Sequence, residues 1–237
     1  MLHLEQLLCC KRSARAKRLS LRINAQNRVI LTIPHAVSYS KALDWAKSQA
    51  PWIQAQLSQL PELISLSQYV ERHPFLSYSG MRLPLIIQDG SGCAKAKNYQ
   101  ISLDGIYVWL DPGKDERWRN QSLYQLVRIL AKQFLTERVD HWVAAYSLQY
   151  HQVRIGDQQT RWGSCSNRKT ISLNWRLLLI RQQLQDAVIL HELAHLTEMN
   201  HSASFWRLLA RYDPNYAAHH RELKRLSREI LSVGRSI

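Results

Sequence analysis

The segment HELAHLTEMNH at residues 191–201 constrains this chain more than any other. It places His191 and His195 four residues apart, so that both project from one face of a helix. Two imidazoles held in this way can bind one Zn²⁺, each at about 2.0–2.1 Å. The flanking residues 187–190 and 193–194 are apolar, and buried histidines need a polar partner such as a metal. We therefore expect a metal site on a largely buried helix that covers residues 183–199.

Glu192 lies next to the first histidine, where it can contact a water molecule on the metal rather than the metal itself. Zinc lowers the pKa of a bound water to about 7, and a nearby carboxylate can take its proton as the water attacks. We expect Glu192 to act as the general base of a zinc-dependent hydrolase. The plainer alternative is a surface helix with a local His–Glu pair, which the apolar flanks disfavour.

A catalytic zinc site needs a third protein ligand and an open fourth position. Glu198 continues the histidine stripe, but it lies about 10 Å along the helix axis from His191. We favour His201, because Asn200 tolerates the left-handed conformation that ends a helix and would fold His201 back beneath it. The rivals on a later helix are His219, His220 and Glu222.

The chain is strongly basic, with 32 Lys and Arg against 18 Asp and Glu and a formal net charge of +14. Such a charge favours the binding of polyanions, including nucleic acid and nucleotides. It is equally consistent with a basic surface that is simply exposed to solvent. Residues 11–22 are basic without an acid, and apolar residues alternate over 19–23 and 29–33. This pattern predicts a hairpin with one basic face, with a turn at residues 24–27, although no defined nucleic-acid motif accompanies it.

Cysteine usage and hydropathy indicate a cytoplasmic protein. No apolar run approaches the roughly 18 residues of a membrane span. The four cysteines are Cys9, Cys10, Cys93 and Cys165. None has Cys-x-x-Cys spacing, so neither a disulfide framework nor a cysteine zinc site is indicated. We interpret Cys165 as a small buried thiol.

The order of strand and helix patterns predicts an α+β fold. A helix over residues 38–60 should bend or restart at Pro51. Strand patterns dominate residues 75–110, with strong turn signals between them and an Asp-Pro-Gly sequence after them. A helical pattern without Gly or Pro covers residues 118–150, and a strand follows at 152–155.

We expect two regions, unless the whole chain forms one domain. Residues 1–115 would be an N-terminal β-rich basic region with one helix. Residues 116–237 would be a zincin-like metallohydrolase core with long helices and a small sheet. This core would include a hairpin over residues 160–175, the metal helix, a helix starting at Ser202 or Ser204, and a last basic helix from 219 to 233.

The hairpin directly before the metal helix is a candidate substrate-binding element. In zinc peptidases, a strand edge beside the metal commonly holds an extended substrate. Gly163 indicates a bulge or a close approach by another backbone. Arg161 and Asn174 are harder to explain as packing than their aromatic neighbours, so we expect both to bind substrate. The candidates for oxyanion stabilisation are Arg161, Tyr212 and His219.

Four ordered motifs together resemble the signature of the YgjP-like metallopeptidase family. They are RWGSC at 161–165, LNWRL at 173–177, HELAH at 191–195 and NHSASFW at 200–206. The basic segment RAKRLSLR at 15–22 also resembles the start of that family, so the similarity covers nearly the whole chain. The family itself resembles the SprT-like and WLM groups of zincins, which include proteases of DNA-bound proteins.

The resemblance implies one zinc ion bound by His191, His195 and His201, with Glu192 as general base. The spacing from the first to the third histidine equals that of the metzincins. That group has a glycine where this chain has Glu198, and it uses a later methionine turn, whereas no methionine follows the site here. A gluzincin-like core therefore suits the chain better.

The leading hypothesis is a zinc metallopeptidase acting on a polypeptide. The first alternative is a nucleotide triphosphate pyrophosphohydrolase, in which the same site attacks phosphorus, although no Gly-rich phosphate loop is present. The second is a DNA-associated SprT-like protease, or a nucleic-acid-binding module whose zinc is structural. Possible nucleic-acid binding through the basic surface is thus an expectation, and no membrane partner is expected.

Overall fold

The computed structural model describes residues 8–24, 27–60, 63–78, 80–91 and 98–235. Strands and helices are both abundant, which confirms the predicted α+β class. The chain divides into two compact units, one ending at Leu63 and the other running from Ile64 to Arg235.

The first unit contains a small sheet in the order β1-β3-β2. Its strands are β1 (Leu8–Ser13), β2 (Ser20–Ile23) and β3 (Val29–Pro34). β2 and β3 pair antiparallel, which confirms the predicted hairpin; residues 25 and 26 of its turn lie outside the described part of the chain. β1 pairs in parallel with β3, a strand that the sequence pattern did not predict.

Two helices follow in this unit, α2 (Tyr39–Ser48) and α3 (Ala50–Leu57). The Ser38 side chain accepts a hydrogen bond from the Lys41 N–H and caps α2. Pro51 lies in the first turn of α3. The N–H groups of a first turn have no partner within the helix, so the absence of an N–H on proline costs no helical hydrogen bond there. The predicted helix over residues 38–60 is thus restarted at Pro51, as the sequence indicated.

The second unit opens with α4 and a sheet in the order β4-β5-β7-β6. These elements are α4 (Leu66–Arg72), β4 (Phe75–Tyr78), β5 (Met81–Asp89), β6 (Tyr99–Ile101) and β7 (Ile106–Leu110). The sequence pattern placed a boundary near residue 115, but Leu76 and Val108 share one core cluster with Val127 and Phe134. The turn at 111–113 therefore separates two elements of one core, and the division of the chain falls earlier.

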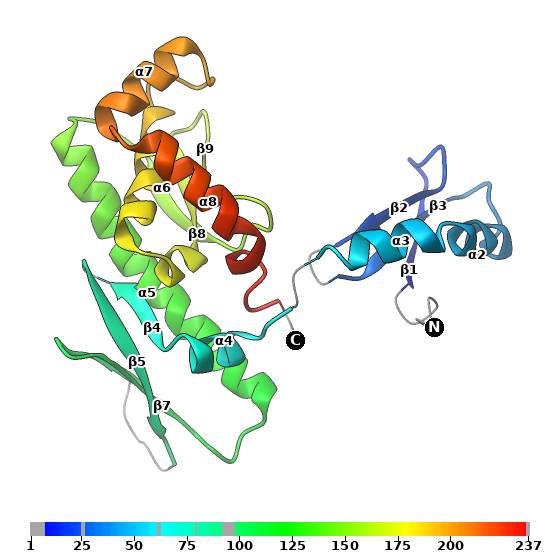
Figure 1. Cartoon of the computed structure of the whole chain (residues 1–237), viewed down its shortest axis with the longest axis horizontal. Coiled ribbons are helices and arrows are strands. Elements are labelled where there is room, and N and C mark those ends of the chain that lie inside the picture. Colours follow the sequence, from blue (N-terminus) through cyan, green and yellow to red (C-terminus); the bar gives the residue numbers. More distant parts are fainter. Residues whose placement is uncertain (1–7, 25–26, 61–62, 79, 92–97, 236–237) are drawn as a thin grey trace. The chain divides into compact units, whose positions relative to one another are not determined.

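Helix α5 (Glu116–Ala145) is the longest element and runs through the second unit (Figure 1). At 1.5 Å per residue it is about 45 Å long. Asp115 caps it by accepting from the Trp118 N–H at 2.8 Å. Its buried side chains recur every three or four residues, as the sequence predicted, and it contacts α4, α6 and the second sheet of this unit.

That second sheet has the order β8-β10-β9. Its strands are β8 (Gln152–Gly156), β9 (Gly163–Cys165) and β10 (Thr170–Asn174). β10 is parallel to β8 and antiparallel to β9, which confirms the predicted hairpin. The outer edge of β8 is closed by α5, because Lys132 donates to the carbonyl of Val153 and Arg128 to that of Ile155. β9 is therefore the remaining edge of this sheet.

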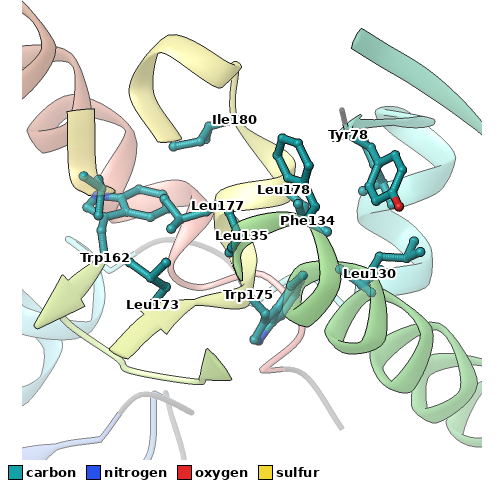
Figure 2. Packing of buried hydrophobic residues seen from close by; sticks show 14 of the residues in the cluster. Tyr78, Leu130, Phe134, Leu135, Trp162, Leu173, Trp175, Leu177, Leu178 and Ile180 are labelled. Atoms are coloured by element: carbon teal, nitrogen blue, oxygen red, sulfur yellow. The ribbon is translucent and has the colours of Figure 1, made fainter. Parts of the chain in front are cut away.

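The chain continues through η1 (Trp175–Leu179), α6 (Gln182–Ala194), α7 (Ala203–Tyr212) and α8 (Tyr216–Ile230). Leu177 and Leu178 of η1 lie beside Phe134 and Leu135 of α5 in the core (Figure 2). This packing holds α6 against the sheet. None of the helices in the described part of the chain has the length and apolar character needed to cross a membrane.

The described cysteines Cys9, Cys10 and Cys165 are free thiols. Cys93 lies outside the described residues.

Candidate metal centre and substrate cleft

Helix α6 ends earlier than its sequence pattern predicts. Its last residue is Ala194, with His195 as the C-cap, whereas the pattern predicted a helix to Met199. The Glu198 N–H donates to the Ala194 carbonyl at 2.9 Å and closes the last turn. Asn200 is not among the described residues with positive φ, so the expected left-handed turn there is not formed. The chain instead folds back over residues 196–201.

This turn brings three imidazoles together. The ligand atoms of His191, His195 and His201 all lie within 4.8 Å of one another. The Nε2 atoms of His191 and His201 are 3.1 Å apart. Two ligands of a tetrahedral zinc ion are about 3.3 Å apart, given nitrogen distances of 2.0–2.1 Å. The donor set therefore fits one divalent metal ion. In the described part of the chain, no other group of His, Cys, Asp and Glu meets this geometry.

The rival ligands have other partners or lie outside this group. His219 Nδ1 is 2.7 Å from Asp213 Oδ2, and Glu222 pairs with Arg181. Glu198 contributes its backbone carbonyl, which lies 3.0 Å from His195 Nδ1. With a proton on Nδ1, this contact orients the ring and leaves Nε2 as the metal-binding atom.

Helix α7 supports the three imidazoles from beneath. The fully buried Phe205 ring lies 5.0, 4.6 and 4.7 Å from the ring centroids of His191, His195 and His201. Ser202 caps α7 by accepting from the Phe205 N–H, so the helix begins at the point where it can present this ring. One residue on, Trp206 stacks on His201 at 5.6 Å. The FW pair therefore restricts the orientation of all three rings.

Burial keeps His191 in the form that can bind a metal. It lowers the pKa of His191 to about 4, and the neighbouring His195 and His201 act in the same direction. The pKa of His201 is also lowered, first by burial and then by His195 and His220. Metal ligation requires the neutral imidazole, so the protein prepares these side chains for it at neutral pH.

Glu192 is nearly inaccessible, with 6% of its surface exposed. Burial raises its pKa to about 8, while the positive charge of Arg161 and the backbone N–H of Cys165 oppose the shift. Gly163 makes this position possible, because a Cβ there would come within 2.7 Å of Glu192 Oε1. The sequence pattern predicted a bulge or the close approach of another backbone at Gly163, but the close neighbour is the Glu192 side chain.

A cleft of about 340 Å³ opens beside Glu192 and His191. Ala187, Val188 and Leu209 form part of its wall. Its polar lining includes Arg161 from the approach to β9, and Tyr216, His220 and Lys224 from α8.

Of the three oxyanion candidates, only Arg161 lines this cleft. Tyr212 packs instead on Tyr146, with ring centroids 4.1 Å apart. Tyr216 and His220 also line the cleft, a position that the sequence analysis did not predict for them. Tyr216 and His220 are four residues apart in a helical segment, and this spacing indicates that the two side chains share one face of the helix.

Asn174 does not line the cleft. It is fully buried, and its Nδ2 donates to the carbonyls of Gln158 at 2.8 Å and Arg161 at 3.2 Å. A side chain with these contacts supports the loop that carries Arg161, in place of the expected contact with substrate. Arg176 is buried beside it and pairs with Asp157, so the LNWRL motif serves mainly to build this corner of the core.

Comparison with known proteins identifies a family. A family model described as YgjP-like, metallopeptidase domain, matches residues 17–226. Among solved structures, the chain is similar to the metallopeptidase zymogen abylysin of Pyrococcus abyssi, with 26% identity and a TM-score of 0.36 over 40% of this chain and 97% of that one. It is also similar to the zymogen jannalysin of Methanocaldococcus jannaschii, with 20% identity and a TM-score of 0.35 over 38% and 94%. No curated protein matched the chain.

Proposed function

The chain belongs to the YgjP-like metallopeptidase family, and we propose that it is a zinc-dependent peptidase with one zinc ion on His191, His195 and His201. A set of three nitrogen ligands suits zinc and leaves a position for chemistry. When bound, such an ion supplies Lewis-acid chemistry, because it acidifies water and polarises a carbonyl group. The remaining steps depend on side chains of this protein.

The position of Glu192 is the observation that carries the proposal. Its carboxylate lies between the histidine pair on α6 and the backbone of β9, in a site that raises its pKa to about 8. The pKa of about 8 belongs to the protein without metal, and a divalent cation on the histidines would lower it, so that Glu192 is ionised and can take a proton from the attacking water near neutral pH. Glu192 then passes this proton to the leaving amine.

The free edge of β9 would hold the substrate. A polypeptide that pairs with β9 extends the sheet by backbone hydrogen bonds and lies along the side where Glu192 is found. Arg161 stands at the start of this strand and lines the cleft, where its charge can face the scissile carbonyl. A polypeptide is therefore the proposed substrate.

The experiment is hydrolysis by the zinc-loaded protein, with an unfolded protein and nucleoside triphosphates assayed side by side. Glu192→Gln keeps the size of the side chain and removes the base, so cleavage should fall by at least about 10²-fold. The matched control is Glu137→Gln, which removes an exposed carboxylate on α5.

Protein cleavage that is lost in Glu192→Gln and kept in Glu137→Gln supports the proposal. Triphosphate cleavage with the protein left intact would overturn it in favour of a nucleotide hydrolase. Cleavage that requires added DNA would keep the peptidase chemistry and assign the basic charge to a DNA partner.

A further inference from the structure

The β8-β10-β9 sheet has two faces of opposite character. Val153, Ile171 and Leu173 point to the core and are buried. The alternate positions of the same strands carry polar side chains, because successive residues of a strand face opposite sides. On this second face, Ser172 of β10 pairs with Arg154 of β8 and with Ser164 of β9.

This polar face forms part of a pocket of about 590 Å³. Three arginines line it, Arg154 from β8, Arg161 from the approach to β9, and Arg168 from the turn between β9 and β10. Hydroxyl groups, including those of Ser164 and Ser166, contribute further donors. No Asp or Glu belongs to its lining, and none of the ion pairs seen among described residues involves these arginines. The pocket thus gathers positive charge without an acidic residue in its lining, and Glu192, on which the charge of Arg161 acts, lies in the lining of the metal cleft.

The pocket and the metal cleft share one lining residue. Arg161 lines both, and β9 contributes Gly163 to the cleft and Ser164 to the pocket. A peptide paired with the edge of β9 would point alternate side chains to opposite faces of the sheet. Every second substrate side chain would then pass over the face that carries the three arginines.

We propose that this pocket selects Asp or Glu side chains of the substrate near the cleaved bond. The proposal rests on the peptidase function proposed above, and it names the substrate class of that site. Guanidinium groups bind carboxylates by paired, charge-assisted hydrogen bonds. One compact pocket beside a strand edge fits single side chains at alternate positions, whereas a nucleic-acid backbone would need an extended basic track.

The test begins with the cleavage sites that the zinc-loaded full chain makes in an unfolded protein, identified by mass spectrometry. Acidic residues should be enriched at one fixed position relative to the cleaved bond. A peptide from such a site is then compared with its Glu→Gln counterpart. The ratio of their kcat/KM values should be about tenfold, as expected for a hydrogen-bonded ion pair.

Two variants decide whether the arginines cause this ratio. The double substitution Arg154→Gln and Arg168→Gln should bring the ratio close to one. Arg225→Gln removes an exposed arginine of α8 that lines neither pocket, and it should leave the ratio unchanged. Binding of both peptides to Glu192→Gln protein, followed by fluorescence anisotropy, gives the same comparison without cleavage and should show the same preference.

Peptide cleavage without an acidic preference would overturn the inference, as would a preference that persists in the double variant. Binding of a single-stranded oligonucleotide that is lost in the double variant, with the peptide ratio unchanged, would assign the pocket to nucleic acid. A complete absence of peptide cleavage would contradict the proposed function instead. In that case, equal affinity for the acidic peptide and its Glu→Gln counterpart would also overturn the inference that the pocket selects acidic side chains.

Discussion

The backbone of Gly163 lies directly against the side chain of Glu192. A Cβ at position 163 would come within 2.7 Å of Glu192 Oε1 and 2.8 Å of its Cγ. This approach lets the Cys165 N–H of the same strand act on the carboxylate and lower its pKa, against the larger effect of burial. The edge strand and the proposed general base therefore hold each other in position.

Gly163→Ala should inactivate the protein without removing its metal ligands. The added methyl group must displace either β9 or the Glu192 carboxylate, and a shift of about 1 Å at a reacting group can reduce the rate by about 10²-fold. We expect a loss of that size in kcat/KM with zinc content unchanged. Gly113→Ala is the control, because its Cβ would meet only the Asp111 side chain, at 3.2 Å. Activity in Gly163→Ala within a factor of three of the unmodified chain would contradict this account.

Phe205→Leu should weaken metal binding. The ring of Phe205 contacts all three imidazoles, and residues that orient metal ligands typically contribute 10- to 100-fold to affinity. Competition with a chromogenic chelator should show a loss of about tenfold. Phe134→Leu makes the same change elsewhere in the core, so it should lower stability and leave zinc affinity as it was. Equal zinc affinity in the two variants would show that Phe205 only fills space.

Asp186→Asn should destabilise the attachment of α6 to α5. Asp186 accepts from Arg138 Nε at 3.0 Å and Nη2 at 2.7 Å, and from Trp142 Nε1 at 3.1 Å. The side chains of Arg138 and Asp186 are 18% and 16% exposed, so water replaces their hydrogen bonds only in part. The loss in unfolding free energy should therefore be about 1–3 kcal/mol.

Urea denaturation measures this loss, with Glu71→Gln as the control. Glu71 and Arg119 form an exposed pair at 3.8 Å, and breaking it should change the stability by less than about 0.5 kcal/mol. Equal losses of unfolding free energy in Asp186→Asn and Glu71→Gln would contradict the prediction.

Cys165 should react slowly with iodoacetamide. Burial, followed by the negative charge of Glu192, raises the pKa of its thiol to about 11. The thiolate is the reactive form, so at pH 8 only about one molecule in 10³ carries it. The rate should rise about tenfold with each pH unit until the pH approaches 11. Mass spectrometry can follow Cys165 beside the exposed Cys9, and equal rates at pH 8 would contradict the prediction.

Local periodicity explains which parts of the fold were predictable. The α5 pattern, the β2–β3 and β9–β10 hairpins and the restart at Pro51 all depend on residues close together in the chain. The parallel pairing of β1 with β3 has no local signal, and it was missed. The boundary near residue 115 was placed on a turn, whereas the core that joins Leu76 to Phe134 crosses that turn.

The sequence by itself determined the metal-binding residue types and the i, i+4 spacing of His191 and His195, because one helical turn brings such a pair together. The tertiary structure alone decided that α6 ends at Ala194, that Asn174 is buried behind Arg161, and that Gly163 touches Glu192. It also decided that arginines from β8, the β9 approach and the following turn share one pocket. These relationships join separate elements, and their packing depends on the whole core rather than on any local pattern.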